Sequence, residues 1–319
     1  MRTTQIPGTE LKPSAICLGT GGMGSSIERD SAFAMLDAFL AQGGNFLDTA
    51  KVYADWLPIE RSSSEKTIGR WMKARRNRSH VIVGTKGAHP DLATMHIPRL
   101  SPQEIAADVA ASLEHLQTDY IDLYWLHRDD PARPVGEIIE ALNAHTQAGR
   151  LRYIGCSNWR VERIRAAQEY AAVHRLQGFC GDQMLWSLAV VNPGGLADKT
   201  LVAMDAGLHA YHQASGMAAI PYSSQANGLF NKMAAGKLAE MPPQYRLAEN
   251  EKRMARIRRL AADSGLTVTQ VSLGYLMAQP FTTIPIVGCR NMEQLTDSLS
   301  AGEVALTPEQ VRFLETGLD

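Results

Sequence analysis

The sequence predicts an α/β protein whose fold is a (β/α)8 TIM barrel with an N-terminal β-hairpin and extra C-terminal helices. Eight short apolar runs of strand length recur along the 319 residues, and each is followed by a segment with helical spacing of its apolar side chains. No sequence repeat, low-complexity segment or linker divides the chain, so residues 1–319 are expected to form a single barrel domain. An open doubly wound sheet is the alternative.

The first elements follow from turn residues and apolar spacing. Residues 1–13 are expected to form the hairpin, with Pro7-Gly8 as its turn. A first strand, Ala15 to Leu18, then opens into a glycine-rich loop. In the helix that follows, apolar side chains fall three and four apart from Phe33 to Leu40, and the pair Gly43-Gly44 ends it.

The alternation of strand and helix continues to the end of the chain. The remaining strand-like runs are 45–47, 81–83, 121–126, 153–156, 179–182, 218–220 and 283–287. Helices are expected near 64–75, 102–117, 135–148, 160–174, 198–214, 250–263, 267–278, 291–299 and 307–316. Residues 223–249, rich in Gly, Pro, Asn and Met, are expected to form one long loop and are a candidate lid.

Composition and charge argue against several classes of function. The formal net charge is −1 and no long Lys/Arg run occurs, so the sequence carries no electrostatic signal for nucleic acid or an acidic membrane. No run approaches about 18 apolar residues, and the N-terminus lacks the apolar core of a signal peptide. We therefore expect a cytoplasmic protein. Its four cysteines lack metal or disulfide spacing, so they are expected to be reduced and no metal site is predicted.

Polar side chains concentrate where the strand-like runs end, which is where the chemistry of a (β/α)8 barrel lies. The second run ends at Asp48, and Tyr53 follows five residues later. The third run ends at Lys86 and the fourth at His127. Polar or aromatic residues also follow the fifth to eighth runs: Ser157, Asn158, Gln183, Tyr222, Ser223 and Arg290.

The first four of these side chains could form one proton-transfer unit without a metal. A phenol has an ordinary pKa of about 10, and an adjacent ammonium such as Lys86 would lower that pKa toward neutrality. Asp48 would keep Lys86 charged despite partial burial. His127 could then donate a hydrogen bond to the substrate oxygen that Tyr53 protonates.

A longer set of motifs, in this order and spacing, resembles the aldo-keto reductase superfamily over essentially the whole chain. The set is Asn45-Phe46-Leu47-Asp48-Thr49-Ala50-Lys51-Val52-Tyr53, Ser64-Glu65, Gly84-Thr85-Lys86, Asp122-Leu123-Tyr124-Trp125-Leu126-His127, Ile154-Gly155-Cys156-Ser157-Asn158 and Gln183. The resemblance implies a barrel that binds NADPH or NADP⁺ and passes hydride directly to the carbonyl carbon of an aldehyde, ketone or sugar, or runs the reverse reaction. It further implies that Tyr53 is the general acid or base, that Lys86 and Asp48 tune it, and that His127 orients the carbonyl.

The resemblance also implies the residues that hold the nicotinamide end of the cofactor. Ser157, Asn158 and Gln183 match the side chains that bind the carboxamide, and Tyr222 matches the aromatic that stacks on the nicotinamide face.

The resemblance extends to the phosphates of the cofactor. Ser223 and Gln225 belong to the loop that contacts the pyrophosphate, and Arg290 with Gln294 falls where the family reads the 2′-phosphate. A guanidinium suits that role because its donors form a fork that matches a phosphate. Ser224-Gln225 replaces the family's usual Pro-Leu, and Ser298 replaces an asparagine that meets the adenine.

The substrate is less well defined by the sequence. Trp56, Met23 and Trp186 are candidates for the wall of the substrate site, and such a rim suits a sugar, an aromatic aldehyde or a cyclic ketone. Trp125 shares a strand face with His127 and is expected to fill the barrel. Two other functions stay open: a barrel isomerase or lyase that uses Tyr53 and Lys86 without nicotinamide, and a non-catalytic, nucleotide-binding redox sensor. The oligomeric state is not predicted.

Overall fold

The computed structural model describes residues 1–318, and its sheet contains eight parallel strands. The strands are β1 Cys17–Gly19, β2 Phe46–Asp48, β3 Ile82–Gly87, β4 Ile121–Leu126, β5 Leu151–Ser157, β6 Gly181–Gln183, β7 Ala218–Ala219 and β8 Ile286–Gly288. Their order is β7-β6-β5-β4-β3-β2-β1-β8, which leaves β7 and β8 at the two ends.

The barrel closes between β7 and the residues just before β8. The backbone nitrogen of Ala219 donates to the carbonyl oxygen of Thr282, and that of Ile284 donates to the carbonyl oxygen of Ala219, each at 2.9 Å. Ala219 and Thr283 form a parallel bridge at this seam. The predicted (β/α)8 barrel is therefore confirmed, and the open doubly wound sheet is wrong because such a sheet leaves its two edges unpaired.

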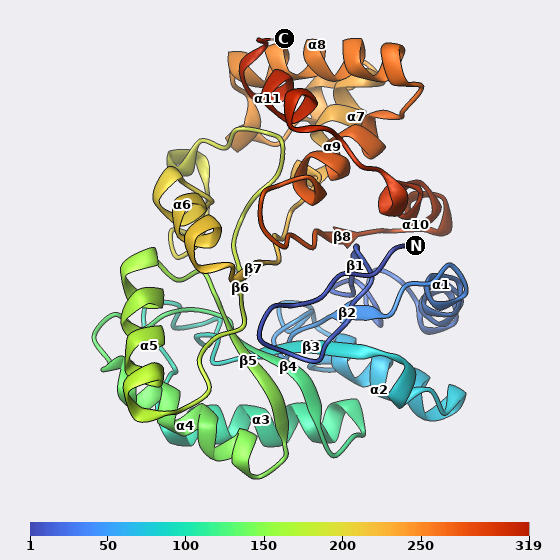
Figure 1. The fold of residues 1–319 in the computed structure, drawn as a ribbon. Helices are drawn as coiled ribbons and strands as arrows, with labels where there is room; N and C mark the ends of the chain where they lie inside the picture. The colour runs from blue at the N-terminus through green and yellow to red at the C-terminus, as the bar shows by residue number, and fades with distance from the viewer. Residues whose placement is uncertain (319) are drawn as a thin grey trace.

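Helices cover the outside of the barrel (Figure 1). The α-helices are α1 Arg29–Ala41, α2 Ser63–Arg75, α3 Pro102–Leu116, α4 Val135–Gln147, α5 Val161–His174, α6 Ala206–Ser215, α7 Leu229–Ala234, α8 Ala248–Ser264, α9 Val268–Met277, α10 Met292–Leu299 and α11 Pro308–Thr316. Short 3-10 helices lie at η1 Arg78–His80, η2 Pro193–Gly195, η3 Ala226–Gly228, η4 Leu238–Glu240, η5 Pro243–Tyr245 and η6 Ser300–Glu303.

Two predicted segments differ from the structure. Helix α6 begins at Ala206 rather than near residue 198, because the Asp205 side chain accepts a hydrogen bond from the Leu208 backbone and caps the helix there. Residues 198–205 are irregular instead. The predicted long loop 223–249 contains helix α7 and the short helices η3, η4 and η5.

The interior of the barrel has its own hydrophobic cluster, in which Trp125 is fully buried, as predicted. Gly155 faces the indole: a Cβ atom added there would lie 2.3 Å from Trp125 Cζ3, so only glycine fits. Ile6 and Leu11 of the N-terminal segment belong to the same cluster and close one end of the barrel. The Ile6 nitrogen donates to the Leu11 carbonyl at 3.2 Å, as the predicted hairpin requires.

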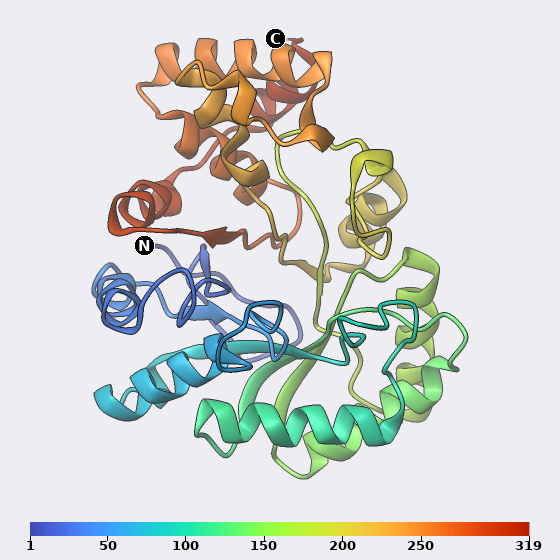
Figure 2. The same ribbon diagram turned by 180° about the vertical axis from the view of Figure 1, so that it is seen from behind.

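The N-terminus lies near β1 and β8 in both views, and α1 lies next to α10 (Figures 1 and 2). Three helices, α7, α8 and α9, lie between β7 and β8, where the barrel needs one, and they gather with α11 on one side of the molecule (Figure 1). Within residues 1–318, no helix combines the length and the apolar character that a membrane crossing needs. The same part of the chain places no group of three or more His, Cys, Asp or Glu side chains where they could hold a metal ion.

Candidate active site

The structure brings Asp48, Tyr53, Lys86 and His127 together at the C-terminal rim of the barrel. Lys86 Nζ donates to Oδ2 of Asp48 at 2.6 Å and to the phenolic oxygen of Tyr53 at 3.0 Å. Its third hydrogen bond, at 2.8 Å, goes to the backbone carbonyl of Thr49. The ring of Tyr53 meets that of His127 edge to face, with centroids 6.0 Å apart.

Strand register produces this convergence. Asp48 ends β2 opposite Gly84 of β3, so Lys86 extends two residues further along the rim on the same face. The turn after β2 then folds over β3, because the Lys51 nitrogen donates to the Lys86 carbonyl at 3.0 Å. Tyr53 stands at the end of that turn, which places its phenol over the ammonium.

The Lys86 ammonium is buried, and all three of its N–H groups have partners. Burial alone would lower the pKa of Lys86, but Asp48 and Tyr53 outweigh it and the pKa lies above its ordinary value. For Tyr53 the balance is opposite: burial raises the pKa, and Lys86 only partly reverses that effect. The expected net lowering of the Tyr53 pKa is therefore wrong for this state of the protein, and Tyr53 is a protonated phenol at neutral pH.

His127 is neutral, and its hydrogen-bonding pattern indicates the tautomer. Burial, with Arg128, Lys86 and His89 adding to it, holds the pKa of His127 well below its ordinary value. Within residues 1–318, Nδ1 of His127 is sealed from solvent without a hydrogen-bond partner, whereas Nε2 is not sealed. A buried Nδ1 without a partner costs more free energy as an N–H donor than as a bare acceptor nitrogen. The proton is therefore assigned to Nε2. Nε2–H can then donate to a substrate oxygen.

Gln183 connects the predicted cofactor site to the four catalytic candidates. Its Nε2 donates to Oδ1 of Asp48 at 2.8 Å, which gives both oxygens of that carboxylate a donor. Gln183 is fully buried, and its Oε1 has no partner among residues 1–318. A buried acceptor of this kind fits an incoming amide N–H group.

Asn158 lies in the left-handed backbone region, with φ of 61°, and its side chain is fully used. Its Oδ1 accepts from the Tyr222 hydroxyl at 2.6 Å and from the Val202 nitrogen at 3.1 Å. Its Nδ2 donates to the His127 carbonyl at 3.3 Å and to Ser157 Oγ at 3.1 Å. Ser157, Asn158 and Tyr222 thus form one connected rim beside His127.

The residues expected at the cofactor phosphates lie after β7 and β8. Ser223 has a left-handed φ of 51°, and Gln225 Nε2 donates to Ser298 Oγ at 2.9 Å. Arg290 is exposed, and its backbone nitrogen donates to Oε1 of Gln294 at 2.9 Å. No partner of the Arg290 guanidinium is found in the described part of the chain, so that group is free to meet an anion.

The three candidate substrate residues differ in their exposure and surroundings. Trp56 is 58% exposed and lies three residues beyond Tyr53, so it is accessible to a bulky substrate. Met23 is 1% exposed and packs in the main hydrophobic core, so its burial does not support its assignment to the substrate wall.

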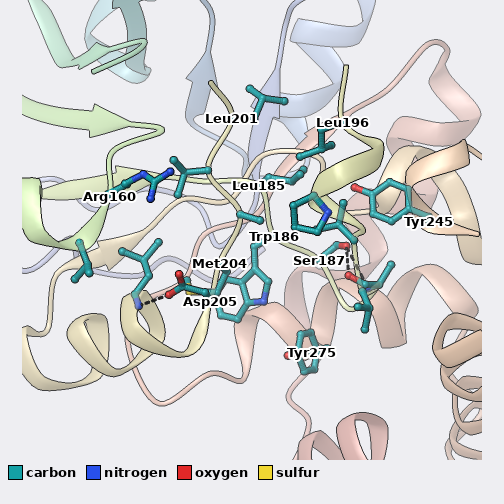
Figure 3. A pocket seen from close by; sticks show the side chains of 18 of the residues that line it. Arg160, Leu185, Trp186, Ser187, Leu196, Leu201, Met204, Asp205, Tyr245 and Tyr275 are labelled. Atoms are coloured by element: carbon teal, nitrogen blue, oxygen red, sulfur yellow. Dashed lines mark hydrogen bonds between the residues drawn. The ribbon is translucent and has the colours of Figure 1, made fainter. Parts of the chain in front are cut away.

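Trp186 faces the helical layer rather than the four catalytic candidates. Its ring neighbours are His209, Tyr275 and Phe281, with centroids 6.0 to 6.3 Å away. It lines a cavity of about 540 Å³ together with Leu185, Met204 and Tyr245 among others, and none of the four catalytic candidates lines that cavity (Figure 3). Its assignment to the substrate wall near Tyr53 is therefore not supported by its position.

Sequence reasoning missed two residues of the rim, Arg128 and His89. Arg128 is buried and donates to the His127 carbonyl at 2.7 Å, to Asp198 Oδ2 at 2.8 Å and to Thr200 Oγ1 at 2.7 Å. It thereby fixes the irregular segment 198–205 to the end of β4. The sequence did show a charged residue, Arg128, next to His127, and this was the one signal that could have identified it. Nothing in the sequence pairs Arg128 with Asp198, 70 residues later.

A parallel barrel with a buried, hydrogen-bonded group of Lys, Asp and Tyr side chains at its C-terminal rim is typical of barrel enzymes. Comparison with known proteins shows which family of barrel enzymes this is. A model of the Aldo/keto reductase family matches residues 15–316. Norsolorinic acid reductase B of Dothistroma septosporum is 28% identical, over 97% of this chain and 79% of its own.

Two further relatives are similar over nearly the whole chain. YrpG of Bacillus subtilis, an uncharacterized oxidoreductase, is 31% identical over 98% of this chain and 95% of its own. Aryl-alcohol dehydrogenase [NADP(+)] of Phanerodontia chrysosporium is 28% identical over 97% of this chain and 83% of its own. The chain belongs to the aldo/keto reductase family and is an NAD(P)H-dependent oxidoreductase.

Proposed function

We propose that the protein reduces an aldehyde or ketone to an alcohol with NADPH, or runs the reverse reaction, and that Tyr53 is the general acid or base. The observation that carries this proposal is the three-way contact of Lys86 with Asp48, Thr49 and Tyr53. Because Lys86 donates to the phenolic oxygen, the phenol's own proton remains available for the substrate.

Tyr53, Lys86 and Asp48 have different roles in the proposed proton transfer. When the Tyr53 O–H donates its proton to the substrate oxygen, the resulting phenolate lies 3.0 Å from the Lys86 ammonium, which stabilises it. Asp48 acts through Lys86, whose charge it maintains at 2.6 Å. General acid catalysis of this kind contributes about 10² to 10⁴ in rate. In the oxidation direction the same phenolate accepts the alcohol proton.

His127 orients the carbonyl. Its Nε2–H is the available donor, and because the ring is neutral it can hold the oxygen without competing with Tyr53 for the proton. Arg128 fixes the backbone of His127 by its bond to the carbonyl oxygen.

NADPH would supply the hydride. The Oε1 atom of Gln183, buried and without a partner among the described residues, suits the N–H group of a carboxamide, and the ring of Tyr222 suits the nicotinamide face. The free guanidinium of Arg290 suits the 2′-phosphate. One relative is named an NADP(+)-dependent dehydrogenase, which supports NADPH over NADH.

The substrate proposed here is a small aromatic carbonyl compound or the corresponding aryl alcohol. The name of one relative, aryl-alcohol dehydrogenase, supports this class, as does the exposed Trp56 three residues from Tyr53 in the sequence. Family membership leaves no support for an isomerase or lyase without nicotinamide. The redox-sensor alternative is an outcome of the test below. The cytoplasmic location stays a prediction of the sequence.

The test is turnover of benzaldehyde by the purified protein with NADPH and, separately, with NADH, followed at 340 nm. We expect oxidation of NADPH that depends on both protein and aldehyde and is faster than oxidation of NADH. Binding of NADPH without turnover of any aldehyde, ketone or sugar offered would favour the non-catalytic sensor instead.

A further inference from the structure

His89 lies on the rim of the barrel just after β3 and adjoins the catalytic histidine. Its ring meets that of His127 edge to face with centroids 4.7 Å apart, and the ring of Tyr53 lies on His127 as well. His89 is 9% exposed. The three rings therefore form a row, and His89 is the member that the proposed reaction does not use.

The proton on the His89 ring is placed by the backbone. Nδ1 lies 2.7 Å from the carbonyl oxygen of Pro90, and because a carbonyl oxygen can only accept, Nδ1 must carry the hydrogen. A neutral imidazole with its proton on Nδ1 has a bare Nε2, which is an acceptor. In the described residues Nε2 of His89 has no hydrogen-bond partner and is not sealed from solvent.

The charges around His89 keep it neutral. Burial is the main effect that lowers the pKa of His89, and Arg128 and Arg99 add to it, while the Pro90 hydrogen bond and Asp198 oppose it. Around neutral pH, Nε2 of His89 therefore remains an acceptor, next to a His127 whose Nε2 is a donor. Two adjacent rings thus offer the substrate one donor and one acceptor.

This pair matches a substrate that has the complementary groups side by side. A carbonyl oxygen accepts from His127, and a hydroxyl on the ring carbon ortho to the carbonyl group can donate to His89. We propose that His89 is a specificity residue, which selects aromatic carbonyl substrates with a hydroxyl group ortho to the carbonyl group by accepting that hydroxyl's hydrogen bond at Nε2. The inference rests on the proposed carbonyl reductase activity and names the substrate class within it.

Three variants distinguish the role of His89 Nε2 as a hydrogen-bond acceptor from the role of the His89 ring in packing. His89→Asn places an amide N–H where Nδ1 donates to Pro90 but leaves no atom at the position of Nε2. His89→Gln extends an amide to the position of Nε2 and so restores an acceptor. His89→Phe keeps the edge contact with His127 and removes both nitrogen atoms.

The experiment compares 2-hydroxybenzaldehyde with benzaldehyde and with 2-methoxybenzaldehyde, which has no hydroxyl donor. The quantity measured is the ratio of kcat/KM for 2-hydroxybenzaldehyde to that for benzaldehyde, with NADPH and with the alcohols quantified by chromatography. The intrinsic difference in reactivity between the aldehydes cancels when variant and wild-type ratios are compared.

We expect the ratio to fall about 3- to 10-fold in His89→Asn and His89→Phe, the loss of one hydrogen bond, and to be largely kept in His89→Gln. Turnover of benzaldehyde and of 2-methoxybenzaldehyde should change less than about 3-fold in all three variants. An unchanged ratio in His89→Asn and His89→Phe, with benzaldehyde still reduced, would overturn the role of His89 alone. Failure of the wild type to reduce any of the aldehydes would overturn the proposed function and this role with it.

Discussion

Gln183 donates a hydrogen bond of 2.8 Å to Oδ1 of Asp48, across the barrel from β6 to β2. The other carboxylate oxygen accepts from Lys86 at 2.6 Å. Asp48 is therefore held by one residue of the proposed catalytic group and by one residue of the proposed cofactor site. This arrangement couples the charge that tunes Tyr53 to the side chain expected to hold the nicotinamide.

Replacing Gln183 tests this connection. In Gln183→Leu, Oδ1 of Asp48 loses its donor in a buried site, which should lower the free energy of unfolding by about 1–3 kcal/mol. Binding of NADPH should weaken in the same variant. Both quantities can be measured, by urea unfolding and by fluorescence titration. Gln147→Leu, on the exposed end of α4, is the control and should change neither. Unaltered cofactor affinity in Gln183→Leu would remove Gln183 from the cofactor site.

Removal of Lys86 should destabilise the fold as well as stop the reaction. Lys86→Met leaves the Asp48 carboxylate buried beside an apolar chain, and breaking a buried pair in this way costs about 3–5 kcal/mol. Lys86→Met combined with Asp48→Asn removes both charges and should recover part of that loss. Chemical denaturation of the single and double variants measures the difference. Equal stability of the two variants would show that Asp48 is not an unpaired charge in Lys86→Met.

The pH dependence follows from the direction of the Tyr53 pKa. Because burial holds that pKa above about 10, the phenol stays protonated and reduction should be level from about pH 6 to about pH 9. Oxidation needs the phenolate and should rise steadily with pH over the same range. His127, whose pKa is lowered, stays neutral throughout this range, so its titration does not reduce the rate above about pH 6. Reduction that fell away with an apparent pKa near 7 would contradict this assignment.

Arg290 should discriminate between the two cofactors. Arg290→Ala is expected to raise the dissociation constant of NADPH at least about 10-fold and that of NADH less than about 2-fold, because only NADPH has a 2′-phosphate for the guanidinium. Arg258→Ala, on the exposed face of α8, is the matched control. Equal weakening of both cofactors would place Arg290 elsewhere than at the 2′-phosphate.

The barrel could be predicted from the sequence because its strands and helices differ in apolar periodicity, and the convergence of Asp48, Tyr53, Lys86 and His127 because each of the four ends a strand or follows one. The pairing of Arg128 with Asp198 could not be predicted, because residues 198–205 form no helix or strand whose position the sequence would indicate. The substrate wall was harder still. Met23 and Trp186 look alike in the sequence as apolar loop residues, and only packing shows that both belong to the main hydrophobic core, with Trp186 against His209, Tyr275 and Phe281.

The pKa of Tyr53 shows another limit of sequence reasoning. The direction of the Lys86 effect follows from its charge, but the opposing effect of burial depends on how deeply the turn after β2 sinks into the rim. His89 was missed for a similar reason. Its acceptor nitrogen is defined by a hydrogen bond to the next residue's carbonyl, which no sequence pattern marks.

Single-turnover reduction of benzaldehyde by Tyr53→Phe with NADPH bound shows directly whether Tyr53 is the general acid. Tyr120→Phe, whose ring packs between Arg78 and Arg152 away from the site, is the control. We expect Tyr53→Phe to lose at least about 100-fold in rate, the contribution of a general acid, while its NADPH dissociation constant changes less than about 3-fold. Tyr120→Phe should match the wild type. A Tyr53→Phe variant that reduces benzaldehyde at the wild-type rate would contradict the account.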